Sequence, residues 1–216
     1  MGRNKLPLVP LGSELLKTWP LMVIVAWCLI QVVSCGDAEA KAAKAVVFVT
    51  NYLQRGDLST KPQRKEVTGT VRVFASPGEY EPATFSIRSA VELKGIRVEL
   101  AGDLKGAQGS TIAKAAVEVR LVDPFEEWTK KKFEGFLLKK NTVGIAANTT
   151  RRFWVTVHVP DDAKPGVYRS KILIGRTAAK AGTNPGPLKI LKTLAYEVEV
   201  LPIRLLTAQE TGMAFF

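Results

Sequence analysis

Apolar and polar side chains alternate with a period of two residues through most of this chain, from residue 44 onward. Phe85 and Ile87 fall on one face of the extended segment 83–89. Thr84 and Ser86 fall on its opposite face. This pattern is typical of a strand with one buried and one solvated face. Helical periodicity is almost absent here, so the chain is not expected to be built from packed helices.

Eight segments show this pattern, and turn-forming Gly, Pro, Asp and Asn residues separate them. They are 46–49, 70–74, 83–89, 95–101, 116–122, 152–159, 167–174 and 188–200. Short, evenly spaced strands without intervening helices predict an all-β fold, an antiparallel sandwich of two sheets. Each sheet is expected to be polar outside and packed inside. Residues 123–141 break the pattern, which indicates a long loop or a short helix.

Residues 161–168 (DDAKPGVY) form a predicted turn that leads into a strand. Tyr168 follows Gly166 at the start of this strand, which is the position of the tyrosine corner in immunoglobulin-like folds. The hydroxyl of such a tyrosine bonds the backbone a few residues upstream. An ordinary buried tyrosine is the alternative. We therefore predict an immunoglobulin- or fibronectin-like β-sandwich in which Tyr168 and Gly166 have structural roles.

The first 40 residues differ from the rest of the chain. Arg3, Lys5 and Lys17 precede residues 21–33 (LMVIVAWCLIQVV), which contain a single polar residue. A spanning helix needs about 20 apolar residues, so this shorter run predicts the helix of a signal peptide over residues 1–40.

Two cleavage sites compete in this segment. Residues 32–35 (VVSC) resemble a bacterial lipobox, in which Cys35 is acylated and becomes the new N-terminus. Residues 38–40 (AEA) fit ordinary signal peptidase, which would cut after Ala40. An uncleaved interfacial helix is a third alternative. Either cleavage predicts an exported protein, as a cell-envelope lipoprotein or in periplasmic or secreted form.

Cysteine and histidine are scarce. Cys28 and Cys35 are the two cysteines, and both fall in the predicted signal segment. The body is therefore expected to fold without a disulfide. With one histidine in the chain, a multi-ligand Cys/His metal site is not expected, and no cofactor is predicted.

The formal net charge is +11. Such a surface favours anionic partners, for example acidic glycans, phosphate-rich polymers or lipid headgroups. A solvated surface without a specific ligand is the alternative. Because we expect export, nucleic acid is not a predicted partner. Lys130, Lys131 and Lys132 form the densest charge cluster and are candidates for anion binding, although such a run is usually a solvated loop.

Three aromatic residues are candidates for sugar contacts, because exposed rings stack on the apolar C–H faces of sugars. Trp128 lies in the irregular segment 123–141, Tyr80 is predicted in a loop, and Trp154 is out of phase with the core residues of its strand. The alternative is that each ring covers the edge of the core or packs against another domain. We favour that alternative for Trp154.

No motif of a serine hydrolase, zincin, P-loop or dinucleotide-binding protein occurs in the sequence. Glu79 and Glu81 could serve as paired carboxylates for glycoside hydrolysis. They follow a Pro-Gly turn, where we expect them to pair with Arg or Lys or to bond backbone N–H groups. His158 is interpreted as a structural strand residue. No catalytic residue is predicted.

Four motifs carry a resemblance to a known family. They are residues 78–86 (GEYEPATFS), 104–106 (LKG), 152–160 (RFWVTVHVP) and 163–168 (AKPGVY). Together they resemble the N-terminal β-sandwich of large exported bacterial proteins related to glycoside hydrolase family 123. The resemblance covers about residues 45–205.

This resemblance implies a domain organisation. In such proteins the sandwich precedes a barrel-type catalytic domain that carries the catalytic carboxylates, so no catalytic residue is carried over to this chain. Residues 44–205 are predicted to form the sandwich. Residues 206–216 are predicted to be a linker or the start of a catalytic domain, since 212–216 (GMAFF) resemble a first barrel strand. The catalytic barrel itself is expected to be absent from these residues.

The implied function is that of a non-catalytic accessory sandwich of an exported glycan-active protein, which supports or positions a catalytic barrel. Its expected partners are that barrel, a polysaccharide, and the membrane if Cys35 is acylated. Two alternatives remain open. One is a freestanding cell-envelope module that binds carbohydrate, and the other is a small complete hydrolase.

Overall fold

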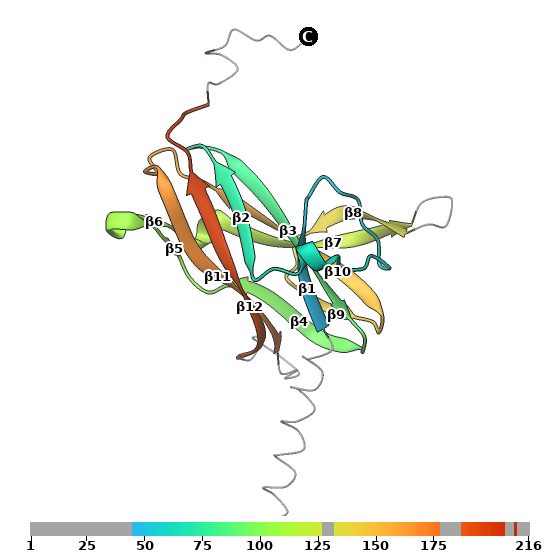
Figure 1. The fold of residues 1–216 in the computed structure, drawn as a ribbon. Helices are drawn as coiled ribbons and strands as arrows, with labels where there is room; N and C mark the ends of the chain where they lie inside the picture. Colours follow the sequence, from blue (N-terminus) through green and yellow to red (C-terminus); the bar gives the residue numbers. More distant parts are fainter. Residues whose placement is uncertain (1–44, 127–131, 178–186, 206–209, 211–216) are drawn as a thin grey trace, which may run out of the picture. The chain divides into compact units, whose positions relative to one another are not determined.

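Figure 1 shows the computed structural model, which describes residues 45–126, 132–177, 187–205 and 210. These residues belong to one compact unit, Lys41–Phe216, and form an all-β fold, as predicted. The predicted signal peptide, with Cys35, lies outside the described residues. Over the residues described, no helix is long and apolar enough to cross a membrane.

The strands pair into two sheets. The strands are β1 Ala45–Thr50, β2 Thr70–Ala75, β3 Tyr80–Ser89, β4 Leu93–Leu100, β5 Leu104–Lys105, β6 Thr111–Ile112, β7 Val117–Glu126, β8 Lys132–Leu138, β9 Thr142–Ile145, β10 Thr149–His158, β11 Gly166–Thr177 and β12 Leu188–Val200. The first sheet has the order β1-β3-β10-β7-β8. The second has the order β2-β12-β11-β4-β9, with β5 paired to β11 and β6 paired to β5. Three short 3₁₀ turns, Arg64–Glu66, Ala107–Gly109 and Lys114–Ala116, lie between strands.

One strand pair departs from the predicted antiparallel arrangement. β2 and β12 run parallel, from the pair Thr70–Ala195 to the pair Ala75–Val200, whereas the other strand pairs of the described chain are antiparallel. The connection from β1 to β2 passes from the first sheet to the second, and β2 enters at the edge beside β12. Alternation of side chains fixes the faces of a strand but not its direction, so the sequence could not show this.

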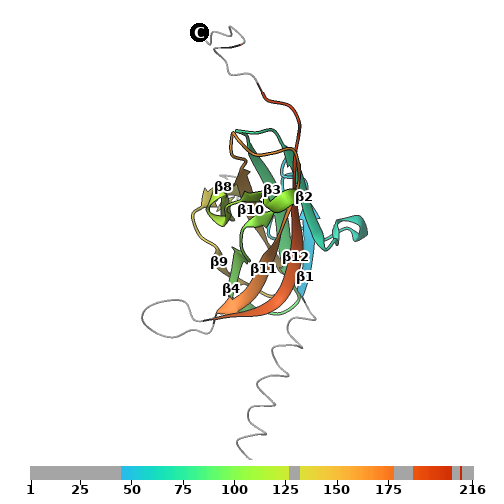
Figure 2. The same ribbon diagram turned by 90° about the vertical axis from the view of Figure 1, so that its left-hand side faces the viewer.

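The core lies between the two sheets. Leu194, Tyr196 and Val198 of β12 are fully buried, as the alternation over 188–200 predicts. Figures 1 and 2 show β12 running beside β11 in both views. Within this core, Phe85 of β3 and Phe153 of β10 are directly opposite each other in the first sheet, and their rings stack with centroids 5.5 Å apart.

The outer face of the first sheet is not uniformly solvated, contrary to the prediction. Thr84 and Ser86 point away from the core, yet they are 1% and 0% exposed. Phe48 of β1 is also fully buried, although it lies outside the core cluster between the sheets. A second buried layer therefore exists on the outer side of β1, β3 and β10.

The segment 51–63, which follows β1, covers this layer. Thr84 Oγ1 donates to the carbonyl of Thr50, the last residue of β1 and the one before the segment, at 2.8 Å. Arg152 of β10 donates to the carbonyl of Gln54 at 2.7 Å. Arg88 of β3 donates to the carbonyl of Thr60 at 3.3 Å. The cover is thus held by side chains of the sheet that donate to backbone carbonyls of the segment, and we call residues 51–63 the covering segment.

Residues 123–141 form neither a long loop nor a helix over the part that the structure describes. β7 and β8 pair as antiparallel neighbours, from Leu121–Leu138 to Glu126–Lys132. The register shifts between Asp123 and Pro124. Proline lacks the N–H that a regular ladder needs. It is tolerated at a bulge, because the regular ladder is interrupted there. The proline and the charges hide the alternation that would have predicted these strands.

Tyr168 makes the hydrogen bond expected of a tyrosine corner. Its buried hydroxyl donates to the carbonyl of Lys164, four residues upstream, at 2.9 Å. Gly106 lies against the ring, because a Cβ at this position would come within 2.8 Å of Cε1 of Tyr168. Gly166 has φ of +139°, a conformation that side-chain-bearing residues rarely adopt. Gly166 thereby fits the predicted turn before Tyr168, and Gly106 adds a close contact from a distant part of the chain.

We expect Tyr168→Phe to lower the free energy of unfolding by about 1 kcal/mol, because the ring remains while one buried hydrogen bond is lost. Urea unfolding followed by tryptophan fluorescence measures the change. Tyr80→Phe is the matched control, since Tyr80 is 66% exposed. An equal effect of the two substitutions would contradict a special role for the Tyr168 hydroxyl.

Candidate functional site

Two of the three predicted sugar-contact residues lie on the outer face of the first sheet. Tyr80 is the first residue of β3 rather than part of a loop, and it is directly opposite His158 of β10. The two rings stack with centroids 4.1 Å apart and planes at 13°. Tyr80 remains 66% exposed, so this stacked pair presents an aromatic surface to solvent.

Trp154 lies on the same face, four residues before His158 along β10. As predicted, it is out of phase with the buried core residues Phe153 and Val155. Tyr52 of the covering segment meets its ring at a centroid distance of 5.8 Å and an interplanar angle of 66°. The side chain stays half-buried. Trp154 thus packs against a segment of its own sandwich and keeps part of its surface free.

Polar groups occupy the surface between these two aromatic pairs. Thr156 lies between Trp154 and His158 on β10 and faces Glu118 of β7. Glu118 is joined to Arg120 by an ion pair at 2.5 Å. All three polar side chains are partly exposed. We call Tyr80, His158, Thr156, Trp154 and Tyr52 the aromatic strip.

The predicted lysine cluster is described only in part. Trp128, Lys130 and Lys131 lie outside the described residues, and Lys132 is the first residue of β8, opposite Glu126. The proposal that these lysines bind an anion therefore remains a prediction.

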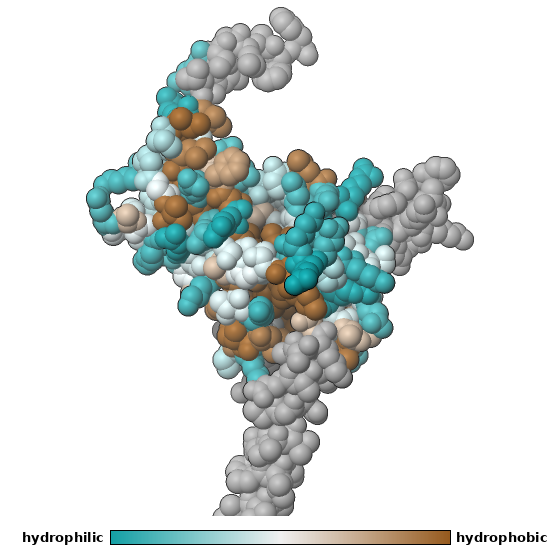
Figure 3. All heavy atoms as spheres, viewed as in Figure 1, coloured by the Kyte–Doolittle hydropathy of each residue, from teal (hydrophilic) through white to brown (hydrophobic). Residues whose placement is uncertain are grey.

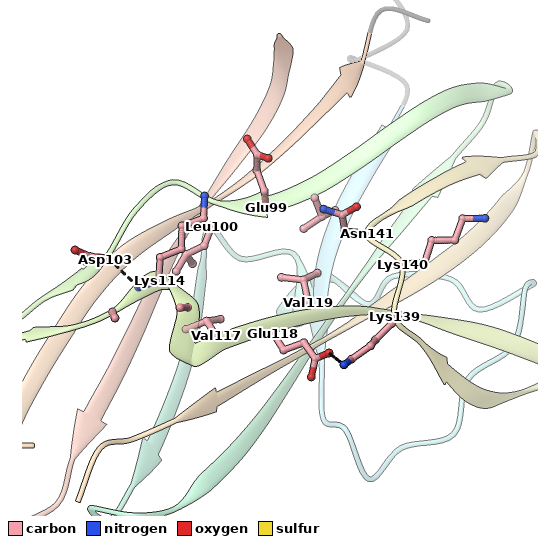
Figure 4. A pocket seen from close by; sticks show the side chains of 13 residues that line it. Glu99, Leu100, Asp103, Lys114, Val117, Glu118, Val119, Lys139, Lys140 and Asn141 are labelled. Atoms are coloured by element: carbon pink, nitrogen blue, oxygen red, sulfur yellow. Dashed lines mark hydrogen bonds and ion pairs between the residues drawn. The ribbon is translucent and has the colours of Figure 1, made fainter. Parts of the chain in front are cut away.

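A groove of about 830 Å³ opens between β4 of the second sheet and β7 of the first. Figure 4 shows Glu99 of β4 and Glu118 of β7 on its two sides, with Lys139 reaching Glu118. The Lys139 Nζ lies 3.9 Å from Glu118 Oε1. The sequence could not indicate this groove, because its lining comes from strands that are distant in the chain and that only the fold brings together.

The charges of the groove do not form an acid–base pair. Arg120 donates a hydrogen bond to Glu118 and lowers the pKa of that carboxyl, which stays ionised at neutral pH. Glu99 is paired with Arg97 at 2.6 Å. Glycoside hydrolysis needs one carboxylic acid that keeps its proton beside a carboxylate, and the lowered pKa of Glu118 makes this residue unsuited to be that acid.

Glu79 and Glu81 have different environments. Glu79 accepts a hydrogen bond from the backbone N–H of Ser76 at 2.8 Å, which confirms the expected bond to the turn. Glu81 lines a groove of about 410 Å³ between β2 and β3. Burial, and secondly the charge of Glu79, raises the pKa of Glu81.

Tyr196 lies in the core close to Glu81. Its buried hydroxyl has no hydrogen-bond partner within the described structure. Burial, and secondly the charge of Glu81, raises the pKa of Tyr196. Across the described residues, no group of three or more His, Cys, Asp or Glu side chains could hold a metal ion.

Glu81 and Glu197 should affect stability with opposite signs. The raised pKa of Glu81 means that the fold binds its proton more tightly, so its contribution is fully present below its ordinary pKa of 4.5 and is lost as the pH rises through the raised pKa. We therefore expect Glu81→Gln to be more stable than the wild type at neutral pH, with the difference vanishing in acid.

Glu197 provides the matched comparison. Hydrogen bonds from Arg169 and Arg72 lower its pKa, so its contribution is present above the ordinary pKa and is lost as the pH falls through the lowered one. Glu197→Gln should be less stable than the wild type at neutral pH. Urea unfolding of both variants across the acid range tests this, and effects of the same sign at neutral pH would refute the assignment.

These features define a β-sandwich domain of two sheets with aromatic rings on one outer face. Residues 57–176, more than half of the chain, match the family described as the Glycoside hydrolase 123 N-terminal domain. The chain belongs to this family, which confirms the resemblance noted from the sequence motifs. No curated protein sequence matches the chain.

A solved structure of a larger enzyme shares the fold. A family 123 glycoside hydrolase from Clostridium perfringens, studied for glycolipid glycan hydrolysis, is 15% identical with a TM-score of 0.57. The match covers 77% of this chain and 29% of that hydrolase, so this chain spans less than a third of its length. A pilin subunit of enterotoxigenic Escherichia coli is 14% identical, with a TM-score of 0.36, and covers 74% of this chain and 99% of the pilin.

Proposed function

We propose that residues 44–205 form the non-catalytic accessory sandwich of an exported glycan-active protein and support or position a catalytic barrel domain. Membership in the Glycoside hydrolase 123 N-terminal domain family is the observation that carries this proposal. The coverage of 29% of the Clostridium perfringens hydrolase is consistent with a role as one part of a larger enzyme.

An exposed apolar end of the sandwich suits contact with another domain. Phe74 of β2 is 67% exposed, and Ile203 and Leu205, which follow β12, are 55% and 53% exposed. Leu201 N–H donates to the carbonyl of Ala75 at 3.0 Å, so the chain after β12 stays close to the end of β2. Figure 3 shows apolar residues gathered where the chain leaves β12. We call Phe74, Ile203 and Leu205 the apolar end.

Exposed apolar clusters of this kind mark surfaces that other protein elements cover. Ile203 and Leu205 come directly after β12, so a domain that follows in the sequence would reach the apolar end with a short connection. We therefore assign the apolar end to the catalytic domain and interpret it as the support that the sandwich offers.

Three of the carboxylates support a non-catalytic role, whereas Glu81, with its raised pKa, is the residue that the hydrolase alternative would need. Glu118 is held ionised by Arg120, Glu99 pairs with Arg97, and Glu79 is bonded to a turn. A small complete hydrolase would need an acid and a carboxylate facing one sugar-sized cleft. This makes the hydrolase the weakest alternative, whereas a freestanding module that binds a polysaccharide is the second candidate.

We also propose that the protein is exported, on the basis of its sequence alone. The basic start and the apolar run of residues 21–33 favour a signal peptide, and the residues around Cys35 favour lipid acylation. An acylated Cys35 would attach the sandwich to the membrane of the cell envelope.

The DNA beyond the codon for Phe216 provides the first test of the accessory role. We expect it to continue into a frame that encodes a barrel domain, and we expect the longer protein to hydrolyse aryl glycosides while the 216-residue chain does not. A stop codon followed by an unrelated gene would favour the freestanding module. Turnover by the short chain that is lost in Glu81→Gln would favour the small hydrolase.

The apolar end predicts a specific stability difference in the longer protein. We expect Phe74→Asp to lower the melting temperature of the longer protein but to leave that of the short chain nearly unchanged, because Phe74 is exposed in the short chain. Ile190→Asp is the matched control, since Ile190 is 45% exposed near the opposite end of β12. Equal effects of both substitutions, measured by calorimetry, would contradict the assignment.

A further inference from the structure

We propose that the aromatic strip binds a glycan chain, which would lie along β10 between the Tyr80–His158 pair and the Trp154–Tyr52 pair. The inference takes its ligand class from the proposed function and adds to it a binding surface on the sandwich itself. Within this surface, His158, Thr156 and Tyr52 gain binding roles that the sequence patterns did not indicate.

The rings provide two stacking positions at a useful separation. His158 and Trp154 are four residues apart on one strand, which corresponds to about 13 Å at the rise of an extended strand. This is longer than a single sugar ring, so the strip suits a chain of several units. Tyr80 presents an exposed ring at one end, and Trp154 presents part of its ring at the other.

The groups between the rings match sugar hydroxyls. Thr156 offers a hydroxyl that both donates and accepts, Glu118 offers carboxylate oxygens, and Arg120 offers N–H donors. Glu118 and Thr156 are directly opposite each other on neighbouring strands, and Arg120 is opposite Trp154. Polar groups therefore flank the aromatic positions on the β7 side, where they can bond the edges of a sugar whose flat faces lie on the rings.

The surface is hollowed beyond Trp154, which allows the chain to continue. A groove of about 250 Å³ is lined by Tyr52, Trp154, Leu137 and Val122, among others. It lies toward β8, because Leu137 and Val122 are paired across β7 and β8. The strip thus extends from an open aromatic platform into a shallow groove.

The strip is built on a rigid base. β10 lies in the middle of the first sheet, between β3 and β7, and its inward residues Phe153, Val155 and Val157 are fully buried. The covering segment fixes one side of Trp154 through Tyr52. Little conformational entropy is therefore lost when a ligand binds, which favours affinity.

Chemistry favours a glycan over a protein as the occupant. A protein partner with an apolar contact surface would bury the Glu118–Arg120 ion pair without replacing its hydration, at considerable cost. Sugar hydroxyls can replace that hydration by hydrogen bonds. The apolar end, by contrast, presents Phe74, Ile203 and Leu205, which is why we assign it to a protein domain.

His158 is the only histidine in the sequence, so its ring provides an unambiguous NMR probe at the strip. The full chain, purified without a histidine tag, is titrated separately with cellohexaose, chitohexaose and hexagalacturonic acid up to millimolar concentration. We expect the His158 ring signals to shift saturably with at least one of these hexasaccharides. Absence of a shift with all three would overturn the proposal.

Four variants test the geometry with the hexasaccharide that binds best. Tyr80→Ala should weaken binding roughly tenfold, the loss expected for one stacked ring, and Tyr80→Phe should retain it. Thr156→Val should weaken it several-fold while preserving the shape of the side chain. Phe74→Ala is the matched control, because Phe74 is as exposed as Tyr80, at 67% against 66%, but lies on the other sheet.

The results separate this inference from the accessory role. Equal weakening by Tyr80→Ala and Phe74→Ala would overturn the strip as the binding site. Loss of all binding, together with a barrel encoded beyond Phe216, would leave the accessory role intact and remove only the strip. Saturable binding at the strip without such a barrel would uphold the strip and favour a freestanding module.

Discussion

Burial of the inward faces of two sheets holds this structure together. The sequence has no cysteine after Cys35, so a disulfide cannot close the body of the chain, and packing must supply its stability. The stacked Phe85 and Phe153 lie within one half of this core, and the corner around Tyr168 closes the turn before β11. Every surface described above is the outer side or the open edge of these packed strands, so each depends on the same burial.

The two faces of the first sheet show how this packing creates a usable surface. The inward side chains of β10 hold the strand in place by packing in the core. Among its outward side chains, Arg152 is buried, whereas Thr156 and His158 are partly exposed. Thr84 and Ser86 are buried on this outer face, whereas Tyr80, stacked on His158, stays exposed. Aromatic rings and polar groups are thus left exposed on a base that does not need to move. The groove between β4 and β7 is different, because charged side chains such as Glu99, Asp103 and Lys139 line it and the described residues place no aromatic ring there.

Sequence patterns predicted the buried faces well, because successive side chains of a strand point to opposite faces, so the apolar positions of an alternating segment are the ones that face the core. Leu194, Tyr196 and Val198 were found where the period of two residues places them. The same patterns could not show the parallel pairing of β2 with β12, since strand direction leaves no mark on alternation. They also missed the cover over Thr84 and the stacking of Tyr80 on His158, because both contacts join residues far apart in the chain. The candidate site was therefore predicted as single residues, and only the fold brought them into one surface.

The parallel pairing of β2 with β12 also has a consequence for the order of folding. β2 lies at the edge of its sheet, and its sheet partner among the described strands is β12. A ribosome that has already made β2 must add more than a hundred further residues before that partner exists. The second sheet can therefore close only after β12 has been made, and such long-range pairing slows folding. Until β12 has been made, β2 has no partner strand in its sheet. The second sheet then stays open, and a chain in this state can be threaded through a narrow pore.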